Sequence, residues 1–316
     1  MKIDIIIVNW NSGSQLADCL ASIKQHHDGF LGRCIVVDNA SSDDSLACLQ
    51  HNEEVILVQA GENLGFGSAC NLGAQQAQSA LLLFLNPDAC LYADTLRKAG
   101  TALLEDEKRA IVGVQLVDKL GRIHRSCTDF PKPMNFIAKS LGLSHILTSM
   151  DFSMRSWDHK DNRTVAHVMG AFYLMRSDLF RNLNGFDPSF FVYLEDLDLS
   201  YRAKQAGYTS YFLSEAQAYH KSGGTSDQVK AKRLFYSLQS RIIYAFKHFS
   251  GLEAFLVSLA ALFIEPFTRG ILCLLKRSPK SLVELSQGYF LLWRWVIKAC
   301  FAWLGRSLLK KAQHET

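Results

Sequence analysis

The stretch IDIIIV at residues 3–8 is a run of β-branched apolar residues interrupted only by Asp4. A short polar segment, NWNSG at residues 9–13, follows it, and apolar residues then recur at helical spacing over residues 16–23. A short run of β-branched apolar residues is typical of a buried strand, and the later spacing is typical of a helix. The sequence therefore begins with a strand, a loop and a helix.

The same pattern recurs along the chain. Further short apolar runs, with helical or polar segments between them, occupy residues 34–37, 55–58, 81–85 and 111–117. Buried strands that alternate with helices favour a parallel sheet with helices on both faces. We therefore predict an α/β fold with a mainly parallel, Rossmann-like sheet.

Two aspartates directly follow two of these predicted strands. Asp38 follows residues 34–37, and Asp88 closes the segment LNPD, in which Pro87 ends the strand. Ligands of open α/β sheets bind beyond the carboxyl ends of the strands. If both strands run in the same direction, both carboxylates face one crevice. An Asx turn or a helix cap is an equally good reading of Asp38.

A concentrated acidic segment occurs in GFDPSFFVYLEDLDLSYR at residues 185–202. It places Glu195, Asp196 and Asp198 directly behind the apolar residues 190–194. Burial and mutual repulsion raise the pKa of such carboxylates toward the range of a general base. The alternative is an ordinary helix start, with Glu195 or Asp198 paired to Arg202 at helical spacing.

Glycines mark other segments. Gly65 and Gly67 resemble a phosphate loop, but Cys70 stands where GxGxxG requires glycine, so a Rossmann dinucleotide site is not expected. These glycines either let the backbone approach a diphosphate or let a helix pack closely on the sheet. Gly170 interrupts a strand-like stretch and indicates a close approach of a ligand or another backbone. Residues 131–163 suggest an inserted segment.

The composition excludes a disordered chain, since 48% of the 316 residues are hydrophobic and 20% are charged. The eight cysteines show no zinc spacing, so we expect reduced and mostly buried thiols, and the N-terminus shows no signal-peptide pattern. Residues 1–227 hold 20 Lys/Arg and 26 Asp/Glu, whereas residues 228–316 hold 14 and 4. We predict an acidic domain over 1–227 and a basic, helical extension over 228–316.

The extension combines cations with large apolar side chains. Residues 228–249 predict a long helix, and the strongly apolar residues 251–264 end at Glu265 and Pro266, short of the roughly 20 residues that span a bilayer. Amphipathic helices of this composition suit an anionic membrane surface. A helical cap or an oligomer interface is the alternative, and a homo-oligomer stays possible. No nucleic-acid recognition module is present.

Several segments together resemble a known family over roughly residues 1–245. They are VVDNASSD (36–43), NLGFGSACNLG (63–73), LNPD (85–88), GAFYLMR (170–176), the acidic stretch 185–202 and AYHKSGGTS (218–226). In this order they resemble family 2 inverting glycosyltransferases of the bacterial rhamnosyltransferase-like branch. The resemblance implies the glycosyltransferase A fold, followed here by the amphipathic C-terminal extension.

The resemblance also implies roles for individual residues. Asp196 matches the catalytic base, with Glu195 as its neighbour. The donor nucleotide is expected at Val8, Asn9, Asp38, Asn63, Gly65 and Asn86. Asp88 matches the last acid of the family's metal motif and His220 a group near the diphosphate or metal, although Asn86 stands where many relatives have Asp. His220 alone is as readily structural. Phosphate or acceptor contacts are considered at Arg125, Asp198, Arg202 and Lys221, for which surface or ion-pairing roles are equally open.

The implied function is an inverting, metal-dependent hexosyl transfer that uses Mg²⁺ or Mn²⁺. We expect L-rhamnose to move from dTDP-L-rhamnose, a nucleotide-sugar donor, to a lipid-linked saccharide acceptor during cell-surface polysaccharide synthesis. The segment HRSCTDFPKP (124–133) carries the rhamnosyl part of the resemblance. The expected location is cytoplasmic, peripheral on the inner face of the membrane. Alternatives are another donor such as a UDP-hexose, or a nucleotide-sugar-binding assembly subunit without turnover.

Overall fold

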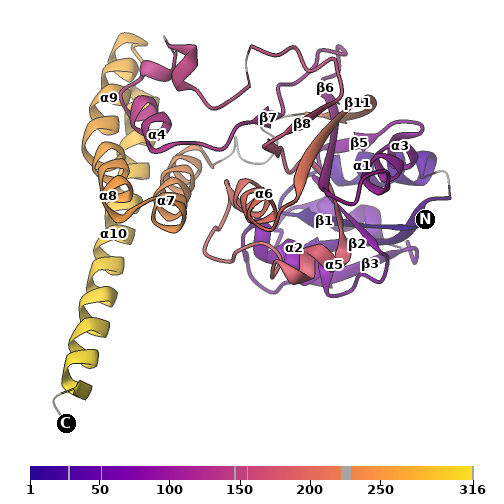
Figure 1. Ribbon diagram of the computed structural model, residues 1–316, viewed down its shortest axis with the longest axis horizontal. Helices are drawn as coiled ribbons and strands as arrows, with labels where there is room; N and C mark the ends of the chain where they lie inside the picture. The colour runs from indigo at the N-terminus through magenta and orange to yellow at the C-terminus, as the bar shows by residue number, and fades with distance from the viewer. Residues whose placement is uncertain (28, 51, 146, 155, 222–228, 315–316) are drawn as a thin grey trace. The chain divides into compact units, whose positions relative to one another are not determined.

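The computed structural model describes residues 1–27, 29–50, 52–145, 147–154, 156–221 and 229–314, with side chains up to residue 301 (Figure 1). The chain divides into two compact units. One comprises Met1–Lys132 and Asp151–Thr225, and the other comprises Pro133–Met150 and Ser226–Thr316. Part of the predicted inserted segment, Pro133–Met150, thus packs with the C-terminal helices. The boundary at residues 227/228 stays a prediction.

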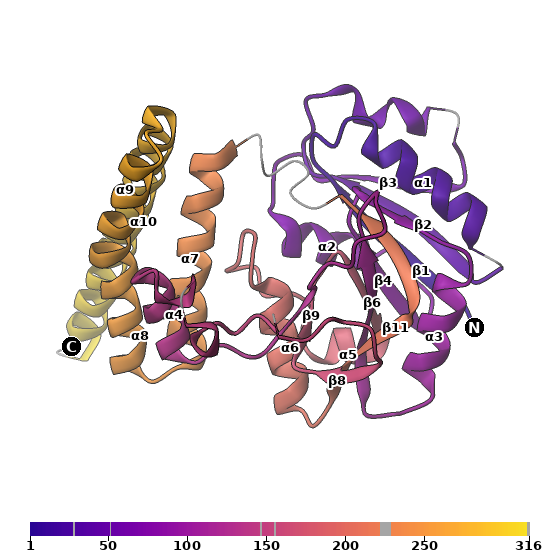
Figure 2. The same ribbon diagram turned by 90° about the horizontal axis from the view of Figure 1, so that it is seen from above.

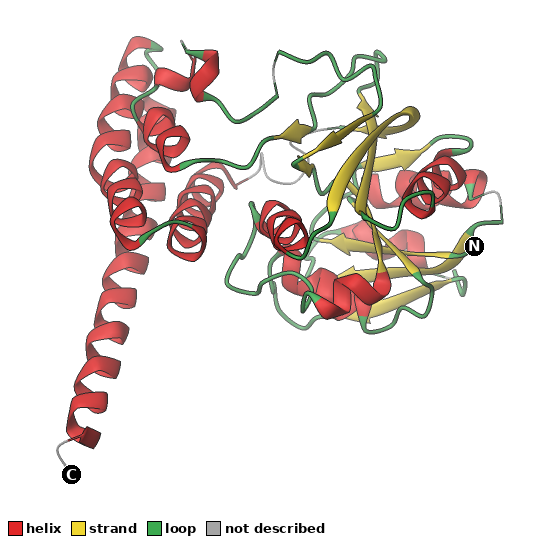
Figure 3. Ribbon diagram, viewed as in Figure 1, coloured by secondary structure: helices red, strands yellow, loops and turns green. Residues whose placement is uncertain are grey.

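The first unit is built on one large mixed sheet with the strand order β3-β2-β1-β4-β10-β6-β11-β5, and β8 pairs with β11 (Figure 3). Its strands are β1 (Ile3–Asn9), β2 (Leu31–Asp38), β3 (Val55–Gln59), β4 (Leu81–Leu85), β5 (Ala89–Leu91), β6 (Arg109–Val117), β8 (Arg163–Val165), β10 (Phe172–Arg176) and β11 (Thr209–His220). A second sheet pairs β7 (Cys127–Thr128) with β9 (His167–Val168).

Helices cover both faces of the large sheet, as predicted. The helices of this unit are α1 (Gln15–His26), η1 (Asp44–Leu49), α2 (Phe66–Ala74), α3 (Thr95–Leu104), α5 (Ser177–Asn182) and α6 (Glu195–Gln205). On β1, Ile5 and Ile7 pack with α1 and α3, whereas Ile6 and Val8 pack with α2, α5 and α6. Figure 2 shows these two sets of helices on opposite sides of the sheet. Because strand side chains alternate between the faces, β1 carries apolar residues on both.

Three strands break the parallel order. β5 and β8 are antiparallel to β11, which runs parallel to β6. β1 runs parallel to β2 and β4, and β2 to β3, but β10 lies between β4 and β6 and is antiparallel to both. The apolar run of β10 was visible in the sequence, but the direction of this strand in the sheet could not be predicted from it. An antiparallel neighbour brings the start of β10 to the edge where β1, β2 and β4 end, because Phe172 pairs with Leu85.

The second unit is helical. Its helices are α4 (Pro133–Ser140), η2 (Leu143–His145), η3 (Thr148–Met150), α7 (Lys230–His248), α8 (Gly251–Leu259), a π-helical turn η5 (Ala260–Ile264), α9 (Glu265–Leu275) and α10 (Pro279–His314). Its apolar core joins α7, η5 and α10 through residues such as Leu238, Ala261 and Leu292.

A buried ionic cluster fastens α4 and α7 to α9. Glu265, 1% exposed, accepts hydrogen bonds from Arg241 and from the Ser140 hydroxyl, the latter at 2.8 Å. Burial raises the pKa of Glu265, but Arg241 and Arg269 lower it further, to about 2. The carboxylate is therefore ionised and compensated, as a buried charge must be.

The helix that contains this cluster is longer than expected. Helical structure continues from Gly251 through Pro266 to Leu275, and within the described residues this one helix is long and apolar enough to cross a membrane by length and composition. The prediction that the apolar stretch is too short was wrong in this respect. Pro266 lies in the first turn of α9, where a missing N–H costs little.

Candidate functional site

The candidate residues gather where the central strands end, an edge that we call the carboxyl edge and define by Asn9, Asp38, 86–88 and 170–171. β1 pairs Asn9 with Asp38 on one side and Ile7 with Leu85 on the other, both in parallel register. Asp38 and Asp88 therefore follow strands of the same direction, as the sequence predicted. From β2 to β10 the edge carries Asp38, Asn9, residues 86–88 and then residues 170–171.

Asn9 holds the loops at the β2 end of this edge. Its side chain is fully buried, and its Nδ2 donates to the hydroxyls of Ser45 (2.8 Å) and Ser41 (3.0 Å), with Asp38 Oδ1 farther away at 3.4 Å. Its Oδ1 accepts from the Ser12 hydroxyl. These bonds give Asn9 a structural role, and its contact with a nucleoside, like that of the buried Val8, stays a prediction.

Only one of the two carboxylate oxygens of Asp38 accepts hydrogen bonds in this network. Its Oδ1 accepts from Asn9 and, at 3.3 Å, from the Ser41 amide, whereas Oδ2 has no hydrogen-bond partner among the described residues. The Ser41 amide bond is the Asx turn foreseen as an alternative. Ala40 has a φ of 61°, a left-handed conformation that is uncommon for a residue with a Cβ. Asp38 thus keeps one acceptor oxygen available.

The glycine-rich loop packs against the acidic stretch. Asn63 Oδ1 accepts from the amide of Gly65 and from Asn39 Nδ2, both at 3.0 Å. Gly65 has a φ of 81°, and a Cβ there would lie 2.1 Å from the carbonyl oxygen of Phe191. That carbonyl accepts from the Phe66 amide at 2.8 Å. Of the two readings of the loop, close packing is therefore the one visible in its contacts, and donor binding by Asn63 and Gly65 stays a prediction.

Asp88 and His220 lie together beyond β4. Asp88 Oδ1 is 3.3 Å from His220 Nε2, with His220 5% and Asp88 9% exposed. β11 brings His220 here because it pairs antiparallel with β5, opposite Ala89. The ring of His124 lies 6.0 Å from that of His220. The side-chain amide of Asn86 has no hydrogen-bond partner among the described residues, while its backbone N–H donates to Ala171 at 3.1 Å.

Asp196 is the carboxylate nearest to this edge on α6. Its Oδ2 accepts from the Gly170 amide at 2.8 Å and lies 3.2 Å from His167 Nε2, and its Oδ1 accepts from the Leu197 amide at 2.8 Å. Burial raises the pKa of Asp196, but His167 and the two amides lower it more, so that it stays below its ordinary value. The close approach at Gly170 is thus to a carboxylate, since a Cβ there would lie 3.1 Å from Oδ2.

The pKa of Glu195 is shifted in the opposite direction to that of Asp196. Glu195 is 5% exposed and directed toward α2, where its Cβ lies 3.5 Å from the Cβ position of Gly67, and its Oε2 lacks a hydrogen-bond partner in the described structure. Burial, and then the charge of Asp196, raise the pKa of Glu195 well above its ordinary value.

The backbone just before α6 is strained. Tyr193 and Leu194 are consecutive residues with φ of 72° and 65°, both left-handed. Such conformations cost about 1–3 kcal/mol each and persist where surrounding contacts impose them. Here the hydrogen bond from Phe66 to Phe191 is one such contact.

The four residues considered for phosphate or acceptor contacts fall into two groups. Asp198 is fully buried and accepts from Arg202 Nε at 2.8 Å, and Arg202 also donates to the carbonyls of Leu183 and Gly185. This is the helical ion pair weighed as the alternative, so we give both residues a structural role. Arg125 and Lys221 are exposed cations with no ion pair among the described residues, and the Lys221 amide donates to Asp88 O at 3.2 Å.

Sequence reasoning missed His167 and Thr128. They lie opposite each other in the β7–β9 pair, and Thr128 Oγ1 is 3.0 Å from His167 Nδ1. Strands of two residues leave no alternation that a sequence pattern can detect. The available signal was the position of His167 three residues before Gly170.

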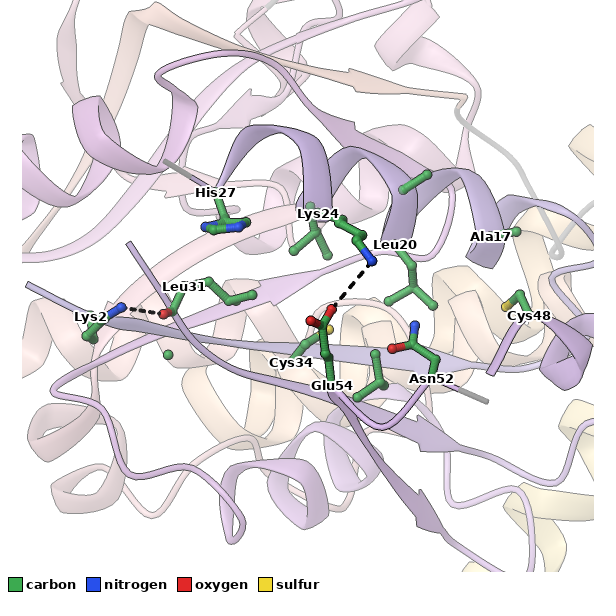
Figure 4. A pocket seen from close by; sticks show the side chains of 14 residues that line it. Lys2, Ala17, Leu20, Lys24, His27, Leu31, Cys34, Cys48, Asn52 and Glu54 are labelled. Carbon is green, nitrogen blue, oxygen red and sulfur yellow. Dashed lines mark hydrogen bonds and ion pairs between the residues drawn. The ribbon is translucent and has the colours of Figure 1, made fainter. Parts of the chain in front are cut away.

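The described residues contain no group of three His, Cys, Asp or Glu side chains placed to hold a metal ion. Asp88 and His220 supply two such ligands. A separate cavity of about 490 Å³ lies between α1 and the β2–β3 strands and is shown in Figure 4. Its lining, including Lys2, Leu31 and Val55, lies at the opposite ends of the strands and contains none of the predicted site residues.

Comparison with known proteins agrees with this architecture. A model of the family described as glycosyl transferase family 2 matches residues 4–183, more than half of the chain. The N-acetylglucosaminyl-diphospho-decaprenol L-rhamnosyltransferase of Mycobacterium tuberculosis is 23% identical over 267 residues, 78% of this chain and 85% of that protein. Rhamnosyltransferase WbbL of Escherichia coli is 25% identical over 249 residues, 76% of this chain and 91% of that protein.

Among solved structures, the mannosyltransferase PcManGT from Pyrobaculum calidifontis in complex with GDP-Man and Mn²⁺ has a similar fold. Its TM-score is 0.53 at 16% identity, over 91% of this chain and 73% of that chain. The α/β architecture with a C-terminal helical part is therefore of the glycosyltransferase A type. The chain belongs to glycosyl transferase family 2 and resembles the rhamnosyltransferase-like branch of that family.

Proposed function

We propose that this protein is an inverting glycosyltransferase that transfers L-rhamnose from dTDP-L-rhamnose to a lipid-linked saccharide for a cell-surface polysaccharide. One observation carries the proposal: along the carboxyl edge, Asp38 lies at the end of β2, residues 86–88 follow β4, and Gly170, whose amide binds Asp196 of α6, lies just before β10. β1 lies between β2 and β4, and neighbouring strands lie about 4.8 Å apart, so these groups follow one another in the order of the nucleoside, the diphosphate and the sugar of a donor.

Asp38 would recognise the nucleoside. Its Oδ2 has no hydrogen-bond partner in the described part of the chain, and a carboxylate oxygen is an acceptor only. The N3–H of thymine or uracil is a donor of matching kind. A charge-assisted bond of this type favours a pyrimidine nucleotide and gives no preference between dTDP and UDP.

Asp88 and His220 would hold a divalent cation, Mg²⁺ or Mn²⁺, with diphosphate oxygens completing the coordination. A carboxylate oxygen and an imidazole nitrogen 3.3 Å apart suit such a cation, whereas the amide of Asn86 is a weaker oxygen ligand than a carboxylate. A bound cation neutralises charge on the departing diphosphate. Arg125 and Lys221 would add positive charge near the same phosphates.

Asp196 would remove the proton from the acceptor hydroxyl. It is ionised at neutral pH, its side chain keeps 17% exposure, and the Gly170 and Leu197 amides fix both oxygens. A fixed, ionised carboxylate with an accessible face is what a general base needs. Glu195, directed toward α2, would support the position of α6 and would not take the proton itself.

The helical unit would attach the protein to the inner face of the cytoplasmic membrane. The helix Gly251–Leu275 exposes a stripe of large apolar side chains at helical spacing: Leu252, Phe255, Leu256, Phe263, Phe267, Ile271 and Leu274. Lys276, Arg277 and Lys280 follow it. Apolar side chains beside cations suit an anionic lipid surface. The buried Glu265–Arg241 pair on the opposite face favours a helix that lies in the interface.

Membrane attachment can be tested with the full chain. Phosphatidylglycerol vesicles should co-sediment the wild type, and Phe255→Glu with Phe267→Glu should release it. Leu120→Glu, which changes a side chain that is 76% exposed in the other unit, is the matched control and should stay bound. Equal sedimentation of both variants would remove the membrane from the proposal.

Transfer itself is tested by incubating the protein with dTDP-L-rhamnose, Mn²⁺ and synthetic N-acetylglucosaminyl-diphospho-polyprenol, the acceptor type named for the mycobacterial relative. A rhamnosylated lipid supports the proposal. A parallel panel of nucleotides, with cation or chelator, reports donor choice through thermal stabilisation. Stabilisation by UDP-hexoses alone would indicate that the donor is a UDP-hexose and not dTDP-L-rhamnose. Binding without any transfer would favour an assembly subunit, and no stabilisation by any nucleotide would refute the donor site.

A further inference from the structure

His167 is a buried imidazole with a partner on each ring nitrogen. It is 6% exposed, its Nδ1 lies 3.0 Å from Thr128 Oγ1, and its Nε2 lies 3.2 Å from Oδ2 of Asp196. Nε2 faces the carboxylate at this distance but outside the geometry of a linear hydrogen bond. The pairing of β7 with β9 fixes this arrangement, because Thr128 is the register partner of His167.

The chemistry of the three groups assigns the protons. An ionised Asp196 only accepts, so the Nε2 that faces it carries a proton. Nδ1 is then a lone pair in neutral imidazole and an N–H in imidazolium. The Thr128 hydroxyl serves either state, since it can donate to the first and accept from the second.

Other ionisable groups surround Asp196 within the described structure. Glu195 and Asp198 on α6 are like charges when ionised, and Tyr173 on β10 lies 3.4 Å from the backbone carbonyl of Asp196. Arg202 is engaged with Asp198 at 2.8 Å. His167 is thus the basic group placed directly against the Asp196 carboxylate.

We propose that His167 is a positioning residue for Asp196: with Thr128 behind it, the imidazole holds Oδ2 so that Oδ1 faces the acceptor hydroxyl, and it tunes the basicity of that carboxylate. The role in transfer rests on the function proposed above. No proton needs to pass to His167, because the orienting contact uses the proton already on Nε2.

The direction of tuning follows from the charges. His167 lowers the pKa of Asp196, opposing the effect of burial. Removing the imidazole raises that pKa, so the ionised base is lost at a higher pH. The acid limb of the kcat/KM profile should therefore move to higher pH, which a purely structural role would not produce.

Four variants test the proposal in the transfer assay. His167→Leu removes the donor, and His167→Gln keeps an N–H in a similar place. Thr128→Val removes the hydroxyl behind the ring, and Thr128→Ser retains it. We expect the Leu and Val variants to lose about tenfold or more in kcat and to shift the acid limb. The Gln and Ser variants should recover much of the wild-type kcat and much of the wild-type position of the acid limb. Thermal stabilisation by dTDP should be unchanged in all four variants.

A second measurement needs no substrate. Denaturant unfolding of His167→Leu, Asp196→Asn and the double variant forms a cycle in which contacting residues give non-additive effects. Additive effects, or an unmoved acid limb in His167→Leu and Thr128→Val, would overturn the proposal. Failure of the wild type to transfer any sugar would instead refute the proposed function, while the cycle would still report on the His167–Asp196 contact.

Discussion

The two ends of the carboxyl edge are built differently. At the β2 end, Asn9 uses its whole side chain to fix the loops, and Asp38 keeps a single free oxygen. At the other end, where Asp196 of α6 contacts Gly170 (the α6 end), two adjacent carboxylates have opposite environments: Asp196 is stabilised as an anion, whereas Glu195 is buried with no described hydrogen-bond partner for Oε2. Under the proposed function, the first end would hold the nucleoside of the donor and the second would hold the charge of the base in place. Variants at the two ends should therefore have separable effects.

The largest effect is expected at Asp196. Asp196→Asn keeps the size of the side chain but removes the negative charge, so transfer should fall by about 100-fold or more. Donor binding should be unchanged, because Asp196 lies at the far end of the edge from Asp38. Single-turnover transfer and dTDP titration measure the two quantities. Transfer near the wild-type rate would exclude Asp196 as the base.

A smaller effect is expected between the two ends, at Asp88. Asp88→Asn leaves His220 without the carboxylate 3.3 Å away and removes an anionic ligand. The Mn²⁺-dependent affinity for dTDP should fall about tenfold, or 1.4 kcal/mol. Calorimetric titration with Mn²⁺ and then with EDTA checks it. If EDTA lowered the dTDP affinity of the wild type and of the variant by the same factor, Asp88 would not be a ligand of the cation.

At the β2 end, Asn9→Ala should act on stability. Its loss removes the side-chain bonds to the Ser12, Ser41 and Ser45 hydroxyls from a buried site, at a cost of about 1–3 kcal/mol, although Ser41 and Ser45 keep bonds to Asn11 and Asp43. Urea unfolding measures this. Asn52→Ala, in the cavity of Figure 4, is the control and should change stability by less than about 0.5 kcal/mol. Equal effects in both variants would contradict the loop-holding role of Asn9.

Glu195→Gln should be the mildest change, since the amide has nearly the size of the carboxyl group and removes only a charge that burial disfavours. The pKa of Glu195 is raised in the folded state, so its stabilising contribution is present below the ordinary value and is lost as pH rises through the raised value. The variant should therefore become more stable relative to the wild type with increasing pH. Unfolding free energies at pH 5 and pH 9 test this, and a constant difference would show that Glu195 does not titrate as described.

Local sequence patterns predicted the parallel strands β1 to β4 and the position of Asp38 and Asp88 at one edge of the sheet. The apolar runs located β1 to β4, and the polar residues after them brought Asp38 and Asp88 to one edge, because parallel strands end together. The antiparallel direction of β10 was not accessible, since it depends on pairing with β4 and β6 and not on the residues of β10 themselves.

The α6 end needed contacts that no local pattern contains. Thr128, His167 and Asp196 are far apart in the chain, and the two-residue strands that align them are too short to recognise. Nothing in the identities of Tyr193 and Leu194 indicated left-handed backbone, which favours glycine or asparagine. Glu195 and Asp196 point in different directions because successive residues of a helix are rotated by about 100°, and which of them faces Gly170 depends on how α6 packs.

The difference between the two ends is tested most directly by the dissociation constant of dTDP, measured by calorimetry with Mn²⁺ for the wild type, Asp38→Asn and Asp196→Asn. Loss of the charged acceptor at Asp38 should weaken binding about tenfold or more, and Asp196→Asn should bind like the wild type. Equal affinities in all three proteins, or a loss confined to Asp196→Asn, would contradict the assignment of the nucleoside to the β2 end and of the base to α6.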